Sequence, residues 1–326
     1  PEVLQVHEEA ELPVPAAGEV RVKVLATSAA FTDTMIRKGV YPGTRGKKPP
    51  FSPGYDFVGV VDELGEGVTK FKVGQMVAEL SVTGAYAQYL CWHEDHLVPV
   101  PKGLDPSEAV SMILTYITAY QMLHRYAKIQ KGQRILIHGA GGAMGTALLE
   151  LGRLLDLEMY GTDAGGKLQV ISDLGGTPID YRTEDVKQRV LELTGDGVDA
   201  VFDGVGASHN IRLLRKGGKL VIFGLASVDM ESLKAKLGFG LKAASMFIKS
   251  FFSRKKSAAF YSIAPLRKKH ADWFHKDLSK LLHLLAEGRL KPIIEERLPL
   301  KDAVKAHERI EKGGIKGKLV LLPHLE

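Results

Sequence analysis

Short strands and helices alternate through the middle of the chain, and this alternation restricts the fold more than any other feature. RILIHG (134–139) is a continuous apolar strand pattern, and GTALLELGRLLD (145–156) has helical spacing. The alternation continues through LEMYG (157–161), KLQVISDLGG (167–176), TPIDY (177–181), EDVKQRVLELTG (184–195), VDAVFDG (198–204), NIRLLRKGG (210–218) and KLVIFG (219–224). Strands and helices that alternate at this spacing predict an α/β fold built on a doubly wound parallel sheet with helices on both faces.

The first hundred residues have a different pattern. EVRVKVLA (19–26) alternates strictly between apolar and polar residues, which predicts a half-buried strand. FVGVVDELG (57–65) and QMVAEL (75–80) continue the pattern, and glycines separate these segments. A β-rich domain with irregular loops is therefore predicted here.

A long helical pattern starts at Asp105-Pro106-Ser107 and runs through residues 109–127, and the tail returns to a β-like pattern at 318–323. We therefore expect two domains. Residues 1–108 and 265–326 form the β-rich domain, and residues 109–264 form the α/β domain.

The chain carries one cysteine, Cys91, among its 326 residues. One thiol excludes an internal disulfide and any structural zinc site built on three or four thiolates. It fits a reducing compartment, and we expect a cytoplasmic protein. The net charge of +6 is weak evidence for a nucleic-acid partner, so we expect none. No apolar run reaches the ~18 residues of a membrane span, and the start at Pro1 suggests that the native N-terminus is missing.

The strand RILIHG runs into AGGAMG and then into a helix, which is the order that a dinucleotide site needs. Small residues let the backbone approach a pyrophosphate, and the helix N-terminus offers free N–H groups. In register the motif reads Ala140-x-Gly142-x-x-Gly145, which departs from a clean G-x-G-x-x-G. The strands and helices around it strengthen the assignment, because small-residue turns alone often serve only packing.

The choice between NADH and NADPH is read about 20 residues further on, in YGTDAGGK (160–167). Thr162 occupies the usual acidic position, and Asp163 follows it. Lys167 lies within reach of a 2′-phosphate, and Arg182 adds positive charge. This pattern favours NADPH over NADH. In the alternative interpretation Asp163 only caps the following helix and Lys167 is solvated.

With these motifs in order, the chain resembles the medium-chain dehydrogenase/reductase superfamily, and within it the zinc-free quinone oxidoreductases. The matching segments are GEVRVKVLA, PGYDFVGVVDELGEGVTKFKVGQMV, GAYAQYL, AVSMILTYITAYQML, GQRILIHGAGGAMGTALLELGR, TPIDYR, GGKLVIFG and AEGRLKPIIEERLPLKDAVKAHERIEKGGIKGKLVL. The resemblance implies a GroES-like substrate domain, a Rossmann domain and an active site in the cleft between them. It also implies a homodimer and a first strand missing before Pro1.

The family's binding positions transfer to this chain one residue at a time. The resemblance implies that the pyrophosphate turn consists of Gly142, Ala143 and Met144, and that the 2′-phosphate lies near Lys167 and Tyr181. It also implies that the turn on the nicotinamide side consists of Phe223 and Gly224, and that Thr118 lies beside the cofactor. Tyr41 matches a tyrosine at the mouth of the substrate cleft. The family's Asn-Phe-x-Asp segment reads Ala30-Phe31-Thr32-Asp33 here, and a tyrosine typical of that segment is Met35. These departures predict a less polar substrate pocket.

Metal-dependent relatives bind a catalytic zinc through a Cys near residue 30 and a His-Glu pair near residue 55. Here SAAFTD has no cysteine, and Tyr55 and Asp56 stand in place of the pair. CWHEDH (91–96) could supply a few zinc ligands, but a fourth ligand is not evident, and a strand end followed by a turn is the simpler interpretation. We therefore expect no zinc.

Loss of the metal points to a conjugated acceptor, because reducing a quinone, enone or enal leaves a delocalised anion that hydrogen-bond donors can stabilise. We expect Tyr41 and Tyr55 to be the donors and Asp33 to orient their loop. The competing interpretations are that the tyrosines only pack and that Asp33 only caps a turn or helix.

Two other functions stay open. One is reduction of enoyl thioesters. The other is cofactor binding without significant turnover in a membrane-associated protein, because the basic segment 231–256 could contact a membrane surface. The simpler interpretation of that segment is a helix that covers the cleft or contacts another subunit.

Overall fold

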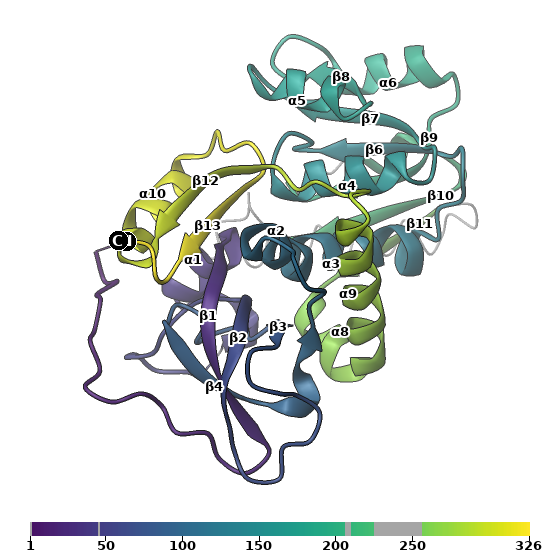
Figure 1. Cartoon of the computed structure of the whole chain (residues 1–326). Helices are drawn as coiled ribbons and strands as arrows, with labels where there is room; N and C mark the ends of the chain where they lie inside the picture. Colours follow the sequence, from purple (N-terminus) through teal and green to yellow (C-terminus); the bar gives the residue numbers. More distant parts are fainter. Residues whose placement is uncertain (1, 45, 206–209, 225–255) are drawn as a thin grey trace. The chain divides into compact units, whose positions relative to one another are not determined.

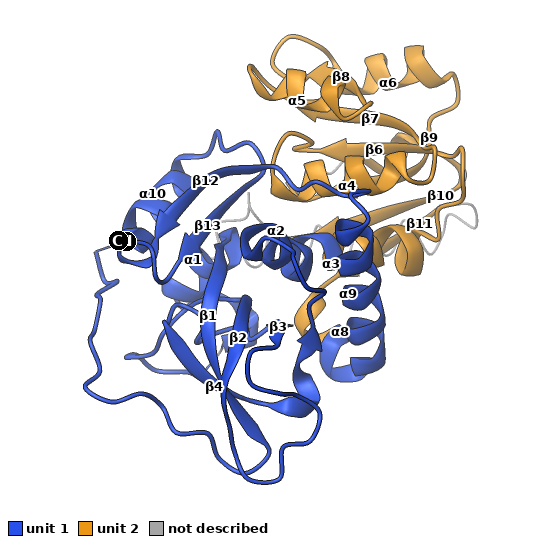
Figure 2. Ribbon diagram, in the orientation of Figure 1, with its two compact units in different colours: residues 1–117, 266–326 blue, residues 118–265 orange. Residues whose placement is uncertain are grey.

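A computed structural model describes residues 2–44, 46–205, 210–224 and 256–326. These residues form two compact units (Figure 2): unit 1 is Pro1–Ile117 with Leu266–Glu326, and unit 2 is Thr118–Pro265. The expected boundaries, after residues 108 and 264, differ from these. All but the last residue of segment 231–256 lies outside the described residues, so its proposed membrane or cleft role stays a prediction.

Unit 1 is built on a mostly antiparallel sheet of order β12-β13-β1-β2-β3-β5, with β4 paired to β1 (Figure 1). The strands are β1 (Glu19–Ala29), β2 (Phe57–Leu64), β3 (Met76–Glu79), β4 (Tyr89–His93), β5 (Val98–Pro99), β12 (Ile294–Pro299) and β13 (Lys318–Leu322). The alternation predicted for 19–26 is present, since Val20, Val22 and Val24 are fully buried. They pack with Phe57 and Val77 in one core cluster.

Helices and single helical turns accompany this sheet. They are α1 (Phe31–Arg37), η1 (Pro42–Thr44), η2 (Glu94–His96), α2 (Pro106–Ser111), η3 (Met112–Tyr116), α8 (Ile263–Lys269), α9 (Ala271–Ala286), η6 (Leu300–Asp302) and α10 (Ala303–Lys312). Helix α9 is the longest of them. Helix α2 begins where the sequence places its start. The Asp105 carboxylate accepts hydrogen bonds from the N–H groups of Ser107 and Glu108, which satisfies two donors of the first turn.

Unit 2 contains a parallel sheet of order β11-β10-β9-β6-β7-β8. Its strands are β6 (Arg134–His138), β7 (Glu158–Asp163), β8 (Thr177–Asp180), β9 (Val198–Asp203), β10 (Leu214–Phe223) and β11 (Ser257–Tyr261). Counted in chain order this is 3-2-1-4-5-6, the Rossmann arrangement, and it confirms the predicted doubly wound sheet. The strand order reverses between β6 and β9, which is where such sheets bind ligands.

The helices of unit 2 are α3 (Ile117–Gln121), η4 (Met122–Ala127), α4 (Ala143–Arg153), α5 (Lys167–Asp173), α6 (Val186–Thr194) and η5 (Asn210–Arg212). The helical pattern at 109–127 is realised with two π-helical segments, η3 and η4. Residues 210–218 form a short 3-10 turn and then the first part of β10. No helix in the described part of the chain is long and apolar enough to cross a membrane.

Candidate functional site

The glycine-rich turn of unit 2 lies between β6 and α4. The N–H groups of its first three residues, Gly139, Ala140 and Gly141, all donate hydrogen bonds within the protein. The carbonyl of Thr162 accepts hydrogen bonds from Gly139 N (2.9 Å) and Ala140 N (3.0 Å). The Asp163 carboxylate accepts one from Gly141 N (3.0 Å). The end of β7 therefore holds the turn in one conformation.

The N–H groups at the start of α4 are in a different situation. Gly142 is the N-cap and offers no side chain to the first turn, so among the described residues the first-turn N–H groups of α4 have no side-chain cap. Gly145 lets the helix approach the turn, because a Cβ there would lie 2.3 Å from the Cα of Ala140. A pyrophosphate fits these donors. The predicted residues Gly142, Ala143 and Met144 form this helix start.

Asp163 is directed back toward the turn. One carboxylate oxygen binds Gly141 N, and the other accepts from Ala164 N (3.0 Å). Only 7% of Asp163 is exposed. Helix α5 starts after Gly166 without a side-chain cap, so Asp163 does not cap that helix.

Two predicted residues flank this end of the turn. Lys167 is the first residue of α5, and its side chain lies beside Gly141, where a Cβ would come within 2.6 Å of the Lys167 Cβ. Tyr181 is exposed after β8. Arg182, also exposed, donates its backbone N–H to Asp180 (2.9 Å). No described carboxylate forms an ion pair with Lys167 or Arg182, so both cations can meet an anionic ligand.

Phe223 and Gly224 end β10, and Phe223 packs over Gly204, where a Cβ would lie 2.9 Å from the ring. Thr118 lies in α3, one turn before Gln121. The Gln121 side chain accepts a hydrogen bond from Tyr261 (2.8 Å), and Tyr261 is the strand partner of Phe223. Thr118 is 6% exposed, and its hydroxyl has no hydrogen-bond partner among the described residues. A buried hydroxyl in that state is suited to a bound ligand.

In unit 1, Tyr41 and Tyr55 are brought together. Their hydroxyl groups form a short hydrogen bond, and their rings meet edge to face with centroids 5.6 Å apart. Tyr55 is fully buried and Tyr41 is half-buried. Burial, with a smaller effect from the Asp33 charge, raises the pKa of Tyr41, so its hydroxyl keeps its proton at neutral pH.

Asp33 lies at the start of α1 and accepts a hydrogen bond from Ala30 N (2.9 Å). It therefore caps α1. It is fully buried, and burial, reinforced by the charge of Asp56, raises the pKa of Asp33 to about 8. The carboxyl is thus mostly protonated at neutral pH.

Asp56 and Lys318 complete this buried polar cluster. Asp56 accepts from Ser28 N (2.9 Å) and Ser28 Oγ (2.6 Å). Lys318, at the start of β13, is 4% exposed and donates to Thr115 Oγ1 (3.0 Å). Its positive charge lowers the pKa of both Asp33 and Asp56, against the larger effect of burial. Sequence reasoning missed Lys318. The available signal was a charged residue at the start of the otherwise apolar strand KLVLL.

The residues at the family's zinc positions do not fit a catalytic zinc site. Tyr55 is bonded to Tyr41, and both oxygens of Asp56 face Ser28. Across the described residues, no group of three or more His, Cys, Asp or Glu side chains could hold a metal ion. In CWHEDH, His93 accepts from Asp95 N (3.3 Å), and burial raises the pKa of the Cys91 thiol.

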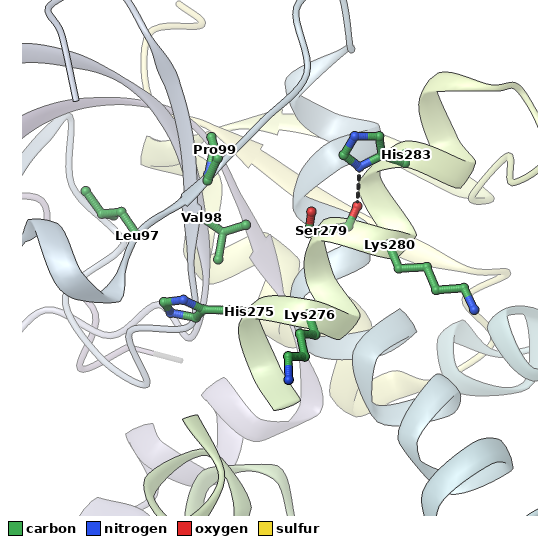
Figure 3. Close-up of a pocket in the computed structure, with 8 residues that line it drawn as sticks. All are labelled: Leu97, Val98, Pro99, His275, Lys276, Ser279, Lys280 and His283. Atoms are coloured by element: carbon green, nitrogen blue, oxygen red, sulfur yellow. Dashed lines mark hydrogen bonds between the residues drawn. The ribbon is translucent and has the colours of Figure 1, made fainter. Parts of the chain in front are cut away.

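A cavity of about 530 Å³ lies beside α9 in unit 1 (Figure 3). It is lined by Leu97, Val98, Pro99, His275, Lys276, Ser279, Lys280 and His283. Figure 3 shows the Lys276 and Lys280 side chains extending in different directions instead of converging on one point. None of the predicted site residues lines this cavity.

Comparison with known proteins agrees with this fold. The model of the alcohol dehydrogenase GroES-like domain matches residues 16–102, and the model named zinc-binding dehydrogenase matches residues 174–321. The chain is 30% identical over 317 residues to a synaptic vesicle membrane protein VAT-1 homolog of Danio rerio; the match covers 95% of this chain but 65% of that relative's length.

Two solved structures are similar over nearly their whole length. Quinone oxidoreductase of Pseudomonas syringae is 30% identical, with a TM-score of 0.81 and coverage of 99% of this chain and 96% of that one. Quinone oxidoreductase of Escherichia coli, solved in complex with NADPH, is 28% identical, with a TM-score of 0.83 and the same coverage. The chain therefore belongs to the medium-chain dehydrogenase/reductase family and is an oxidoreductase of the quinone oxidoreductase-like type.

Proposed function

We propose that this protein is an NADPH-dependent, zinc-independent oxidoreductase that reduces a quinone or another conjugated carbonyl compound, such as an enone or enal. The observation that carries the proposal is the hydrogen bond between the hydroxyl groups of half-buried Tyr41 and fully buried Tyr55. Tyr55 stands where metal-dependent relatives have a zinc ligand, and the pair offers hydrogen-bond donors in place of a Lewis acid.

The preference for NADPH rests on Asp163. An acidic residue that recognises NADH accepts hydrogen bonds from the ribose hydroxyls. Both oxygens of Asp163 are already occupied by backbone N–H groups of the protein itself. Lys167 and Arg182 are cations without an ion-pair partner among the described residues, and they suit a 2′-phosphate. The NADPH in the Escherichia coli relative supports the same choice.

The other predicted cofactor residues would contact different parts of the dinucleotide. The first turn of α4, at Gly142, Ala143 and Met144, would hold the pyrophosphate. Thr118 would offer its hydroxyl near the nicotinamide end, together with the turn at Phe223 and Gly224. When bound, a reduced nicotinamide supplies the hydride.

The protein's own contribution to the chemistry is to stabilise the anion that forms on the acceptor. A quinone or enone spreads this charge over a conjugated system, so a neutral donor suffices where an isolated alkoxide would need a metal. Tyr41 donates a hydrogen bond or proton, and Tyr55 holds the Tyr41 hydroxyl in place from its fully buried position. Asp33 caps α1, which precedes the Tyr41 loop, and so orients it.

The test is oxidation of NADPH against quinones, enones, enals and enoyl thioesters, with NADH as the comparison and Tyr41→Phe and Tyr55→Phe as matched variants. The proposal expects turnover with a quinone, enone or enal, a preference for NADPH and a loss of rate in both variants. Turnover confined to enoyl thioesters would replace the proposed substrate class. NADPH binding without any turnover would favour a binding protein. One zinc per chain in the purified protein would overturn the metal-free mechanism.

A further inference from the structure

A chain of buried polar side chains links the ends of three neighbouring strands behind the pyrophosphate turn. His138 ends β6, Thr162 lies beside it on β7, and Asp203 ends β9. Asn210, in η5, completes the chain. Thr162, Asp203 and Asn210 are each at most 3% exposed. None of them has a role in the proposed chemistry.

The contacts in this chain are continuous. Thr162 Oγ1 lies 2.9 Å from His138 Nδ1, and His138 Nε2 lies 3.0 Å from Asn210 Oδ1. Asn210 Nδ2 donates to Asp203 Oδ2 (2.8 Å), and Val205 N donates to Asp203 Oδ1 (2.8 Å). The chain therefore spans the point where the strand order reverses.

The chemistry of the Asp203 carboxylate at one end determines which group donates in each hydrogen bond of the chain. The Asp203 carboxylate only accepts, so the Asn210 amide nitrogen faces it and the Asn210 oxygen faces His138. His138 must then carry its proton on Nε2. In the neutral ring Nδ1 is an acceptor, which is satisfied by the Thr162 hydroxyl.

We propose that Thr162, His138, Asn210 and Asp203 form a directional hydrogen-bond chain that positions the pyrophosphate-binding turn, and that protonation of His138 reverses its bond to Thr162 and weakens dinucleotide binding. The link to the turn is direct. The Thr162 hydroxyl bonds to His138, and the Thr162 carbonyl accepts hydrogen bonds from Gly139 N and Ala140 N. The same residue therefore belongs to the hydrogen-bond chain and holds the turn. The inference rests on the proposed dinucleotide site.

The pH dependence follows from the groups around the ring. Thr162 faces it from β7, Asn210 from η5, and Asp203 from β9 is the charged group that acts on it. Burial lowers the pKa of His138, and the smaller effects of Asp203 and Asn210 raise it. The ring is therefore neutral at pH 7. Below its pKa both nitrogens become donors, so the Thr162 hydroxyl must turn from donor to acceptor and its own proton no longer has a partner in the chain.

The first experiment needs no cofactor. Long-range ¹H–¹⁵N NMR of the whole chain, with His138 assigned by comparison with His138→Gln, reports the ring tautomer. The expected result at pH 7 is a single neutral tautomer with the proton on Nε2. A proton on Nδ1, or a ring that averages between tautomers, would overturn the proposal whether or not NADPH binds.

The second experiment measures NADPH dissociation constants by calorimetry for Thr162→Val and Asn210→Leu. Each replacement keeps the side-chain size and breaks the chain at one point, and we expect binding about fivefold weaker. Thr194→Val is the matched control. Thr194 is a buried threonine of the same unit that bonds Val190 O (2.6 Å) and Gly197 N (3.1 Å) away from the chain. NADPH affinity should be unchanged in this control.

The third experiment follows the ratio of the wild-type and His138→Gln dissociation constants between about pH 5 and pH 8. The ratio cancels the titration of the cofactor's own phosphate. Wild-type binding should weaken toward acid pH relative to the variant. A ratio that does not change with pH, or equal losses in Thr162→Val and Thr194→Val, would overturn the proposal. If wild-type protein binds neither NADPH nor NADH, the proposed function fails instead, and the NMR result still decides the hydrogen-bond chain.

Discussion

Replacing Asp33 by asparagine should change how the stability of unit 1 depends on pH. Asp33 is fully buried, and its pKa is raised from 3.8 to about 8. In the unfolded chain the carboxyl ionises near pH 4. Between pH 4 and pH 8 the folded protein keeps a proton that the unfolded protein has lost, so the free energy of unfolding falls as pH rises.

The size of the effect follows from that difference. From pH 4 to pH 7 there are about three pH units, each worth about 1.36 kcal/mol, so the wild type loses about 4 kcal/mol. The asparagine side chain of the variant cannot titrate, and its amide oxygen can still accept the N–H of Ala30. The stability of Asp33→Asn relative to wild type should therefore rise by about 4 kcal/mol over this range.

Tryptophan fluorescence during urea unfolding is a suitable assay. The chain has two tryptophans, Trp92 and Trp273, and both belong to unit 1. Asp95→Asn is the control, because a hydrogen bond from Lys70 lowers the pKa of Asp95 from 3.8, so the linkage effect of this carboxyl lies below about pH 4. The difference in stability between this variant and wild type should therefore stay nearly constant between pH 4 and pH 7. Parallel curves for Asp33→Asn and wild type between pH 4 and pH 7 would refute the reasoning about Asp33.

Three further outcomes follow from the sites. Tyr55→Phe removes the hydroxyl that holds Tyr41, so kcat on a conjugated carbonyl should fall about tenfold or more while NADPH affinity stays unchanged; an unchanged kcat would contradict the assigned role. Lys167→Ala should weaken NADPH binding about tenfold and leave NADH binding nearly unchanged in fluorescence titrations; equal losses for both cofactors would speak against a 2′-phosphate contact. Gly145→Ala puts a Cβ 2.3 Å from the Ala140 Cα, so α4 must move away from the turn; both dinucleotide affinity and melting temperature should drop, and wild-type values for both would exclude the close approach.

The sequence alone predicted the features that depend on local periodicity. The alternation from residue 134 to residue 224 predicted the doubly wound sheet, since each apolar run is long enough for a strand and each helical stretch long enough to cross over. The position of the cofactor turn also followed from the sequence, because small residues between a strand and a helix let the backbone approach a pyrophosphate, and this pattern is local in the sequence. The residues placed on the turn and around the substrate came from the family resemblance.

Side-chain partners across long separations came only from the tertiary structure. The direction of Asp163 is an example. One interpretation of its position was a cap of the following helix, but its carboxylate binds Gly141, 22 residues earlier. A carboxylate in that turn has several possible donors within reach, and only the folded backbone decides which of them it meets.

Lys318 and His138 show the same limit more strongly. Lys318 bonds Thr115 across 203 residues, and His138 bonds Asn210 across 72. A pattern of apolar residues indicates which positions are buried, but it does not indicate which buried polar groups lie close enough to each other to form hydrogen bonds. The fold class was therefore determined by the sequence, whereas the protonation states of Asp33 and His138 were decided by burial and by partners that only the tertiary structure brings together.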